Sequence, residues 1–238
     1  DLVWRFQATN DRFGAAFAEI CTKRGFKRPA TMAFNNASGL GNVEGFTKVW
    51  NKRGGQVVAH VTYEPSRPSY RSELQKILAA KPDVIVTGSY LPDTTIILRE
   101  WFQSGADNKW IIPGWAANPE LVKALGAEVC EGLISVETVS NEKSTAYASF
   151  DAAYRKATGK PAATNIYAAM AYDMVISLAL AIEAAGPGAT VEAVNERIRD
   201  VSGAPGTPVF SFTEGKALLA KKADVNYEGA SSKLDFDK

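Results

Sequence analysis

The chain has 238 residues, 46% of them hydrophobic, which is enough for one large domain or two modest ones with a buried core. Its 27 Lys and Arg residues against 26 Asp and Glu leave a formal net charge of +1. This balance argues against nucleic acid or an anionic membrane as the main partner, since either would need a basic surplus gathered on one face.

Helices and strands are predicted to alternate through the first 139 residues. The predicted helices span 11–24, 40–53, 70–80, 94–104 and 119–125, and the predicted strands span 30–35, 56–63, 84–87, 110–112 and 133–139. Short turns containing Gly, Pro or Asn separate them, so the order predicts an α/β fold with a parallel sheet and helices on both faces. Residues 84–87 are apolar or β-branched without alternation, which is typical of a strand buried on both sides.

The pattern changes after Ser140. Three helices, 144–158, 164–185 and 191–201, are predicted with no strand between them, and a short helix is expected near 215–221. A helical block after a complete run of strands and helices indicates another layer or lobe. Its most apolar stretch is interrupted by Asp173 and Glu183, so we expect a buried helix of a soluble protein and not a membrane span.

Residues suited to catalysis or metal binding are sparse. The only histidine, His60, falls within a predicted strand, where a structural role is favoured over that of a general base. No cluster has zinc or calcium spacing, and Cys21 and Cys130 are expected to be two buried thiols, with a disulfide as the alternative. We therefore expect that the protein is not an enzyme and that it binds no metal ion and no cofactor.

A glycine-rich segment offers an enzymatic alternative. Gly39, Gly41 and Gly45 follow a predicted strand and open a helix, and Glu64 ends the next strand, as in NAD(P)-dependent Rossmann-type enzymes. The spacing is one residue longer than the dinucleotide fingerprint requires. The favoured interpretation is a helix start where glycines permit close approach to a strand.

Polar and aromatic residues follow three predicted strands. Asn36 and Ser38 come after the first strand, Ser89 and Tyr90 after the third, and Trp115 after the fourth. The carboxyl ends of parallel strands share one edge of the sheet, and open α/β sheets bind ligands there. These five residues are candidates for recognising a small molecule.

Several segments together resemble a known family. They are Trp4-Arg5 with Asn10, Ser38-Gly39-Leu40-Gly41 leading to Phe46, Gly88-Ser89-Tyr90-Leu91-Pro92, Ala171-Tyr172-Asp173 and Tyr227-Glu228-Gly229-Ala230-Ser231. Their order resembles the branched-chain amino-acid type of periplasmic solute-binding protein, the receptor of an ABC importer related to the leucine/isoleucine/valine-binding proteins.

The resemblance implies a type I periplasmic-binding-protein fold, in which two α/β lobes close around a ligand. By this likeness, residues 1–138 form a nearly complete second lobe, residues 139–205 are the helical remainder of a partial first lobe, and residues 206–238 return to the second lobe. It also implies that an N-terminal part of the first lobe, with any export signal, is missing from this sequence, either through truncation or in a natural short form.

The resemblance also assigns ligand contacts. The turn tyrosine of the amino-acid receptors falls on Ser38, their second cleft tyrosine on Tyr90, and an aromatic contact at the start of the long helix on Tyr167. The acid that pairs with a substrate ammonium falls at Gly114-Trp115, and no acid occurs between Lys109 and Asn118. Loss of that charge partner disfavours an α-amino acid and favours an aromatic or short organic acid, or an amide.

The expected function is that of an exported, periplasmic, monomeric receptor that delivers a small organic solute to the membrane permease of an ABC importer. The alternatives are the NAD(P)-dependent enzyme and a cytoplasmic ligand sensor of the same fold.

Overall fold

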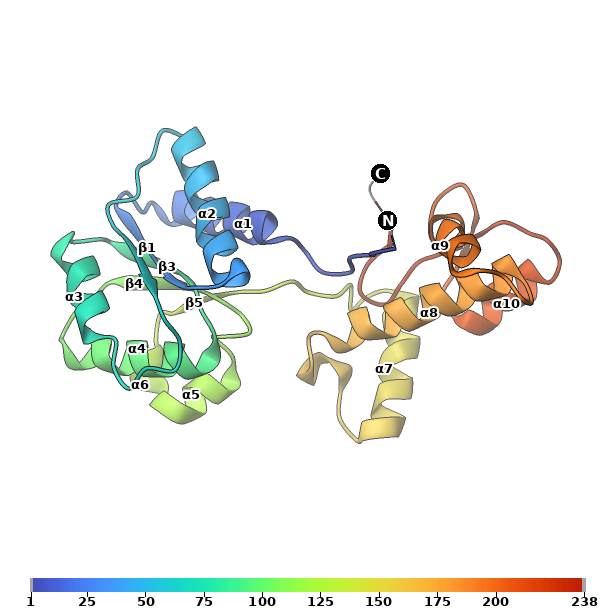
Figure 1. The fold of residues 1–238 in the computed structure, drawn as a ribbon. Coiled ribbons are helices and arrows are strands. Elements are labelled where there is room, and N and C mark those ends of the chain that lie inside the picture. Colours follow the sequence, from blue (N-terminus) through green and yellow to red (C-terminus); the bar gives the residue numbers. More distant parts are fainter. Residues whose placement is uncertain (1, 237–238) are drawn as a thin grey trace. The chain divides into compact units, whose positions relative to one another are not determined.

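The structure, a computed structural model, describes residues 2–236, and the chain divides into two compact units. One unit is Ala8–Glu137, and the other combines the residues up to Gln7 with those from Thr138 onward (Figure 1). Each unit is described by itself below.

The unit Ala8–Glu137 contains a parallel five-stranded sheet with the strand order β2-β1-β3-β4-β5. The strands are β1 (Pro29–Phe34), β2 (His60–Tyr63), β3 (Val84–Gly88), β4 (Lys109–Pro113) and β5 (Ile134–Val136). All five residues of β3 are buried, which confirms the predicted central strand. The parallel α/β architecture predicted from the alternating pattern is also confirmed.

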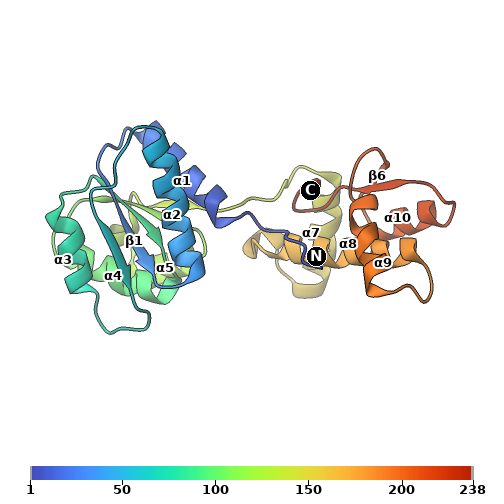
Figure 2. The same cartoon turned by 45° about the horizontal axis from the view of Figure 1, so that its top comes forward.

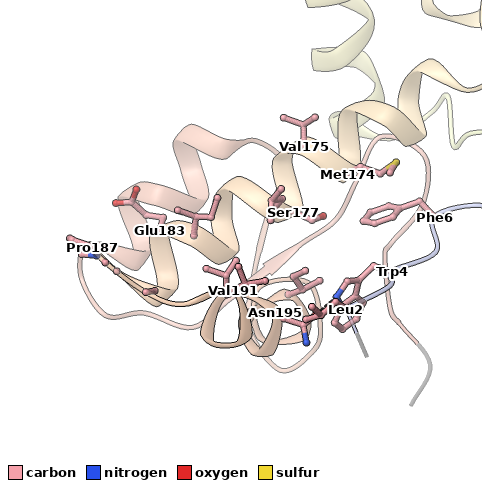
Figure 3. A pocket seen from close by; sticks show the side chains of 17 residues that line it. Leu2, Trp4, Phe6, Met174, Val175, Ser177, Glu183, Pro187, Val191 and Asn195 are labelled. Carbon is pink, nitrogen blue, oxygen red and sulfur yellow. Dashed lines mark hydrogen bonds between the residues drawn. The ribbon is translucent and has the colours of Figure 1, made fainter.

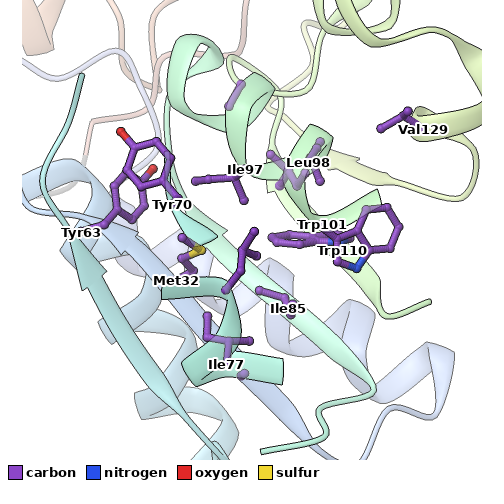
Figure 4. Close-up of a cluster of buried hydrophobic side chains, with 14 of the residues drawn as sticks. Met32, Tyr63, Tyr70, Ile77, Ile85, Ile97, Leu98, Trp101, Trp110 and Val129 are labelled. Carbon is purple, nitrogen blue, oxygen red and sulfur yellow. The ribbon is translucent and has the colours of Figure 1, made fainter. Parts of the chain in front are cut away.

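Helices cover both faces of this sheet (Figure 2). They are α1 (Asn10–Arg24), α2 (Ala37–Lys52), α3 (Arg71–Ala79), α4 (Leu91–Gln103), α5 (Pro119–Leu125) and α6 (Ala127–Cys130). On one face, Phe17 and Phe46 of α1 and α2 pack over Val84 and Val86. On the other face lies the second cluster, shown in Figure 4, whose large members include Tyr70, Ile97, Trp101 and Trp110.

Several element boundaries differ from the predictions because local hydrogen bonds decide them. The helix α1 begins one residue before the predicted start, because the Thr9 side chain caps it by accepting from the amide of Arg12. The helix α2 begins three residues before the predicted start, because the Asn36 side chain caps it. Ladder pairing with β1 shortens β2 to its last four residues, so His60 lies at the start of the strand and not within it.

The cysteines are free, as favoured over a disulfide. Cys21 lies buried on α1, and Cys130 is half-buried at the end of α6. Burial raises the pKa of the Cys21 thiol to about 12, with a smaller contribution from the charge of Asp83.

The second unit is mainly helical. Its elements are α7 (Thr145–Thr158), the 3-10 turn η1 (Ala162–Thr164), α8 (Ala168–Ala185), α9 (Val191–Asp200), β6 (Thr207–Val209), α10 (Phe212–Leu219) and β7 (Val225–Tyr227). The single helix predicted over residues 164–185 is divided, since Asn165 breaks it after η1 and α8 begins at Ala168. The parallel pair β6–β7 forms a small separate sheet.

The chain after Gly206 belongs to the mainly helical unit. Residues 206–238 were expected to return to the lobe of residues 1–138, but that segment packs with the helices of its own unit. Val209, Val225 and Tyr227 share a core with Leu180 of α8 and Ile198 of α9, and β6 pairs only with β7. The division between the two units falls between Glu137 and Thr138.

The helix α8 is less buried than expected. Asp173, Ser177, Leu180 and Ala181 are buried on one side, but the opposite side is open to solvent. The expectation of a buried helix therefore holds for one face of α8 only.

Candidate functional site

The candidate site is the carboxyl edge of the five-stranded sheet. Met32 of β1 is aligned with Thr87 of β3, and Val86 of β3 with Ile111 of β4, so the three strands end at the same edge. The segments that follow them, including the first turn of α2, carry five of the six predicted ligand-binding residues, namely Asn36, Ser38, Ser89, Tyr90 and Trp115. The structure therefore brings these five loop positions to one edge of one unit.

Asn36 and Ser38 lie at the start of α2. The Asn36 Oδ1 atom accepts from the backbone amide of Gly39 at 2.7 Å, so this oxygen is used as a helix cap. Ser38, in the first turn of α2, is half-buried. The cap fixes the loop that presents Ser38, so the two positions have different roles in the site.

Ser89 is held inside the protein. Its side chain is 2% exposed, its hydroxyl accepts from Thr94 at 2.8 Å and donates to Thr87 at 3.1 Å, and its carbonyl accepts from the Trp115 indole at 2.9 Å. These hydrogen bonds join β3, α4 and the loop after β4. Ser89 thus links three segments of the candidate site through its hydroxyl and its carbonyl.

Tyr90 and Trp115 supply the aromatic surface. Tyr90 is 37% exposed and packs edge-on against Phe34 with ring centroids 5.2 Å apart. Trp115 is half-buried and packs edge-on against Phe13 at 5.0 Å, and its indole N–H is already bonded to Ser89. A ligand at this edge would meet the Tyr90 ring and hydroxyl, and the Trp115 ring without its N–H.

Tyr167 belongs to the other unit. It directly precedes α8, is 39% exposed, and its backbone amide donates to Asn165 Oδ1 at 3.1 Å. Tyr167 is therefore not one of the residues gathered at the sheet edge within Ala8–Glu137.

Three residues of the site were missed by the sequence reasoning. Phe34 orients Tyr90, while Thr87 and Thr94 hold the hydroxyl of Ser89. Phe34 is the last residue of β1, so the rule that strand ends carry ligand contacts could have found it. Nothing in the spacing of Thr87 and Thr94 indicates a shared hydrogen bond.

The glycine segment is engaged by the protein itself. A Cβ atom at Gly39 would lie 2.4 Å from the Phe34 carbonyl oxygen, and one at Gly45 would lie 2.9 Å from the Asp11 Cα atom. Glu64 Oε1 accepts from the side chain of Asn35. The predicted close approach of a glycine to a strand is observed at Gly39, whereas Gly45 lies against helix α1. His60 lies exposed with its Nδ1 atom 2.8 Å from the Thr31 hydroxyl.

A separate groove of about 950 Å³ lies in the other unit (Figure 3). Its walls are α8, α9 and the N-terminal segment, and they are mainly apolar, with Ser177, Glu183 and Asn195 as polar members. The six predicted site residues do not line it. Among residues 2–236, no group of three His, Cys, Asp or Glu side chains has the arrangement of a metal site.

Comparisons with known proteins address the whole chain. Residues 2–218 match the family described as "Periplasmic binding protein". A leucine-binding protein from Thermotoga maritima is similar in structure, with 26% identity and a TM-score of 0.71 over 81% of this chain and 55% of that one. No curated protein matches.

Two further solved structures share the fold. One is a solute-binding protein of an ABC transporter from R. palustris in complex with benzoate, with 22% identity and a TM-score of 0.71 over 85% of this chain and 56% of that one. The other is a type 1 periplasmic binding protein from Bordetella pertussis, with 21% identity and a TM-score of 0.69 over 85% and 58%. This chain thus spans less than two thirds of the length of each of these structures.

Proposed function

The chain belongs to the periplasmic binding protein family, and from this premise we propose that it is part of an extracytoplasmic receptor that delivers a small organic solute to the permease of an ABC importer. The observation that carries the proposal is the gathering of an exposed tyrosine, an indole ring and a capped helix start at the carboxyl edge of one parallel sheet. Small molecules are bound at this edge in open α/β folds.

We assign the unit Ala8–Glu137 to the second lobe of the family's fold and the helical unit to the first lobe. The assignment rests on the resemblance of the strand-end segments of Ala8–Glu137 to the cleft segments of amino-acid receptors.

The proposed solute is an aromatic or short organic acid, or an amide, in preference to an α-amino acid. The position where an amino-acid receptor would carry an acid is occupied by Gly114-Trp115, whose indole offers no negative charge to an ammonium group. Tyr90 and Trp115 offer aromatic surface instead. The benzoate bound to the R. palustris protein supports including aromatic acids among the candidates.

A thermal-shift screen of the whole-gene product tests the proposal. Leucine, benzoate and benzamide are the first probes, because they separate an ammonium, an aromatic acid and a neutral aromatic amide. A bound solute raises the melting temperature by mass action. A shift with leucine alone would contradict the proposed solute class, and failure of amino acids, aromatic acids and amides alike would contradict the proposed receptor function.

Substitution of Tyr90 tests whether this residue contacts the bound solute. Tyr90→Ala should weaken binding of the solute found in the screen by roughly 1–3 kcal/mol in calorimetry, because it removes an aromatic contact. Tyr90→Phe separates the ring from the hydroxyl. Phe102→Ala is the matched control, since Phe102 is a 39%-exposed aromatic residue near the far end of α4 and should leave affinity unchanged. Unchanged affinity in Tyr90→Ala would remove Tyr90 from the site. Tyr167→Ala, measured in the same way, tests the sixth predicted contact.

A further inference from the structure

The helices α2, α4 and α5 follow β1, β3 and β4 and begin at the carboxyl edge of the sheet, but α4 begins differently from the other two. The side chains of Asn36 and Asn118 accept backbone N–H groups at the starts of α2 and α5. In the described part of the chain, α4 has Tyr90 at the corresponding position and no side-chain cap. Tyrosine lacks the short side-chain oxygen with which Ser, Thr, Asn and Asp reach these amides. A residue that breaks a local rule at a candidate ligand edge indicates a functional reason for its presence.

The first turn of α4 is held instead through Asp93. The Asp93 side chain is 4% exposed, and its Oδ1 atom accepts from the Tyr70 hydroxyl at 2.7 Å and from the Ser66 backbone N–H at 3.1 Å. An acid at this third helical position often bonds back to the cap residue of its own helix. Here its Oδ1 atom is bonded to the segment between β2 and α3. Asp93 therefore anchors the turn that begins at Tyr90 to a neighbouring segment.

The segment between β2 and α3 is itself fixed by several contacts. Ser66 has a φ of 57°, a left-handed conformation that is uncommon for serine, and its N–H is the one bonded to Asp93. The Tyr70 hydroxyl also accepts from the Arg67 N–H at 3.2 Å, and the Tyr70 N–H donates to Glu100 at 2.7 Å. The segment is thus tied to α4 in the first turn of that helix, at Asp93, and in its last turn, at Glu100.

A series of aromatic rings connects Tyr70 to Tyr90 by a second route. Tyr70 packs edge-on against Tyr63, with ring centroids 4.9 Å apart (Figure 4). Phe34 packs edge-on against both Tyr63, at 6.1 Å, and Tyr90, at 5.2 Å. Tyr63 and Tyr70 are at most 2% exposed, so their rings belong to the core of the unit. Tyr70 therefore reaches Tyr90 both through the hydrogen bond to Asp93 and through packed rings.

We propose that Tyr70 and Asp93 are positioning residues of the solute site, which hold the Tyr90 ring in the orientation that contacts the solute. Both are buried, so they act through Tyr90 and do not touch the solute themselves. Aromatic contacts favour edge-on or offset geometry, so their strength depends on the orientation of the ring. A ring that is fixed before binding also lowers the entropy cost of ordering it in the complex. The inference rests on the proposed function, in which Tyr90 contacts the solute.

Tyr70→Phe is the test variant, because it removes the hydroxyl that donates to Asp93 and keeps the ring. Tyr227→Phe is the matched control. The Tyr227 hydroxyl donates to the buried Asp173 at 2.8 Å, so this variant loses the same kind of hydrogen bond in the other unit. We expect the two variants to lose similar stability, and only Tyr70→Phe to affect Tyr90.

The orientation of Tyr90 is measured first in the protein without solute. The ring signals of the tyrosines are recorded by NMR, and the Tyr90 signal is assigned as the one missing from Tyr90→Phe. We expect this signal to shift or broaden in Tyr70→Phe and to stay unchanged in Tyr227→Phe. A Tyr90 signal that is the same in Tyr70→Phe and in the wild type overturns the proposal, whether or not a solute binds.

Affinity gives the second measurement, by calorimetry with whichever of leucine, benzoate and benzamide binds the wild type. A ring that is in the binding orientation about a third of the time lowers the apparent affinity about 3-fold. We expect a loss of at least ~3-fold in Tyr70→Phe and none in Tyr227→Phe. In the Tyr90→Ala background, Tyr70→Phe should cause no further loss, because the ring that it positions is absent. An equal loss with and without Tyr90 overturns the proposal, since Tyr70 would then act on the fold as a whole.

Two variants of Asp93 test the other end of the hydrogen bond. Asp93→Asn keeps one oxygen that can accept from the Tyr70 hydroxyl, so it should retain most of the affinity, whereas Asp93→Ala should lose at least as much as Tyr70→Phe does. Wild-type affinity in Asp93→Ala overturns the role of Asp93. If none of the three probes binds the wild type, the proposed receptor function is contradicted, and the Tyr90 signal in Tyr70→Phe and Asp93→Ala still decides whether these residues position the ring.

Discussion

Asp173 connects the middle of α8 to a turn more than fifty residues later. It is fully buried, and its carboxylate accepts from the Tyr227 hydroxyl at 2.8 Å, the Ala230 amide at 2.8 Å, the Ser231 amide at 2.7 Å and the Ser231 hydroxyl at 2.5 Å. Burial raises the pKa of the Asp173 carboxyl, and the four hydrogen bonds oppose that rise. One side chain thus closes the C-terminal turn onto the helix.

Replacing Asp173 should destabilise its unit strongly. Asp173→Ala leaves four buried or half-buried donors without their acceptor, so we expect the free energy of unfolding to fall by about 3 kcal/mol or more in urea denaturation. Asp200→Ala is the control, because Asp200 pairs with Arg197 on an exposed surface and such pairs contribute at most about 1 kcal/mol. Similar losses in the two variants would show that the turn is held by other contacts.

Asp151 gives a pH-dependent prediction. The Ala162 backbone N–H at 2.7 Å and the Arg155 guanidinium at 2.5 Å lower the pKa of this carboxyl. A lowered folded-state pKa contributes stability above the ordinary aspartate value, and that stability is lost as the pH falls through the lowered one. Asp151→Asn should therefore melt at a lower temperature than the wild type at pH 7, with the difference closing below about pH 4. A difference of the same size at pH 3 and pH 7 would contradict this assignment.

At the scale of elements, α1 and α2 cross at unusually short range through their glycines. A Cβ atom at Gly14 of α1 would lie 2.2 Å from the Phe46 backbone nitrogen and 2.3 Å from the Gly45 carbonyl carbon of α2. Both neighbours are backbone atoms, so a side chain at Gly14 could be accommodated only by moving one helix away from the other. This close crossing brings Phe17 and Phe46 together over the sheet.

Gly14→Ala should accordingly cost about 3 kcal/mol of unfolding free energy, from overpacking between the two helices. Gly25→Ala is the comparison, since Gly25 has a φ of 76° but no atom within 4 Å of an added Cβ. It should cost only about 1 kcal/mol, from backbone strain alone. Chemical denaturation of both variants separates steric overlap from strain, and a smaller loss in Gly14→Ala than in Gly25→Ala would be inconsistent with the packing described.

The sequence predicted elements where one local signal dominated. The unbroken apolar run of residues 84–87 was sufficient to place β3, and the helix predicted over residues 119–125 coincides with α5. The sequence failed where a distant partner decided the outcome. The start of α2 depends on a hydrogen bond of Asn36, and β7 was missed because three residues form a strand only by pairing with β6.

The candidate site was predictable to the same extent. Tyr90 and Trp115 were correctly placed at the carboxyl edge of the sheet, because the rule that parallel strands end at a common edge needs only the order of strands and helices. The hydrogen bond between the Trp115 indole and the Ser89 carbonyl depends on the conformations of two loops, so the supporting role of Ser89 could not be foreseen. The exposure of one face of α8 could not be predicted either. An apolar sequence pattern predicts burial but does not identify the residues that cover the helix.

At the scale of the whole molecule, one unit is continuous in sequence and the other is not. The unit Ala8–Glu137 contains its complete sheet and both of its hydrophobic clusters. The other unit includes the N-terminal segment in its packing, because the Trp4 indole donates to Asn195 Oδ1 at 2.6 Å and its ring centroid lies 5.0 Å from that of Phe236. The two units therefore differ in what they need in order to fold.

Residues 8–137 expressed alone should fold and unfold in one cooperative transition, as followed by circular dichroism in urea. Residues 138–238 expressed without residues 1–7 should be less stable than the same segment within the full chain. A non-cooperative transition for residues 8–137 would show that the sheet depends on the rest of the molecule.

The chain passes between the two units twice, after Gln7 and after Glu137, and these two connections lie next to each other. Thr138 donates from its hydroxyl to the Gln7 side-chain oxygen at 3.2 Å, so the residues that flank Ala8–Glu137 on either side are held together. The unit Ala8–Glu137 is thus a domain inserted into the other unit, because its first and last residues follow and precede two residues that are in contact. Replacing residues 8–137 with a short glycine linker between Gln7 and Thr138 should leave the other unit folded. The entropy of loop closure changes only slowly with the length of the loop. A foreign domain whose termini lie close together should also be tolerated between Gln7 and Thr138.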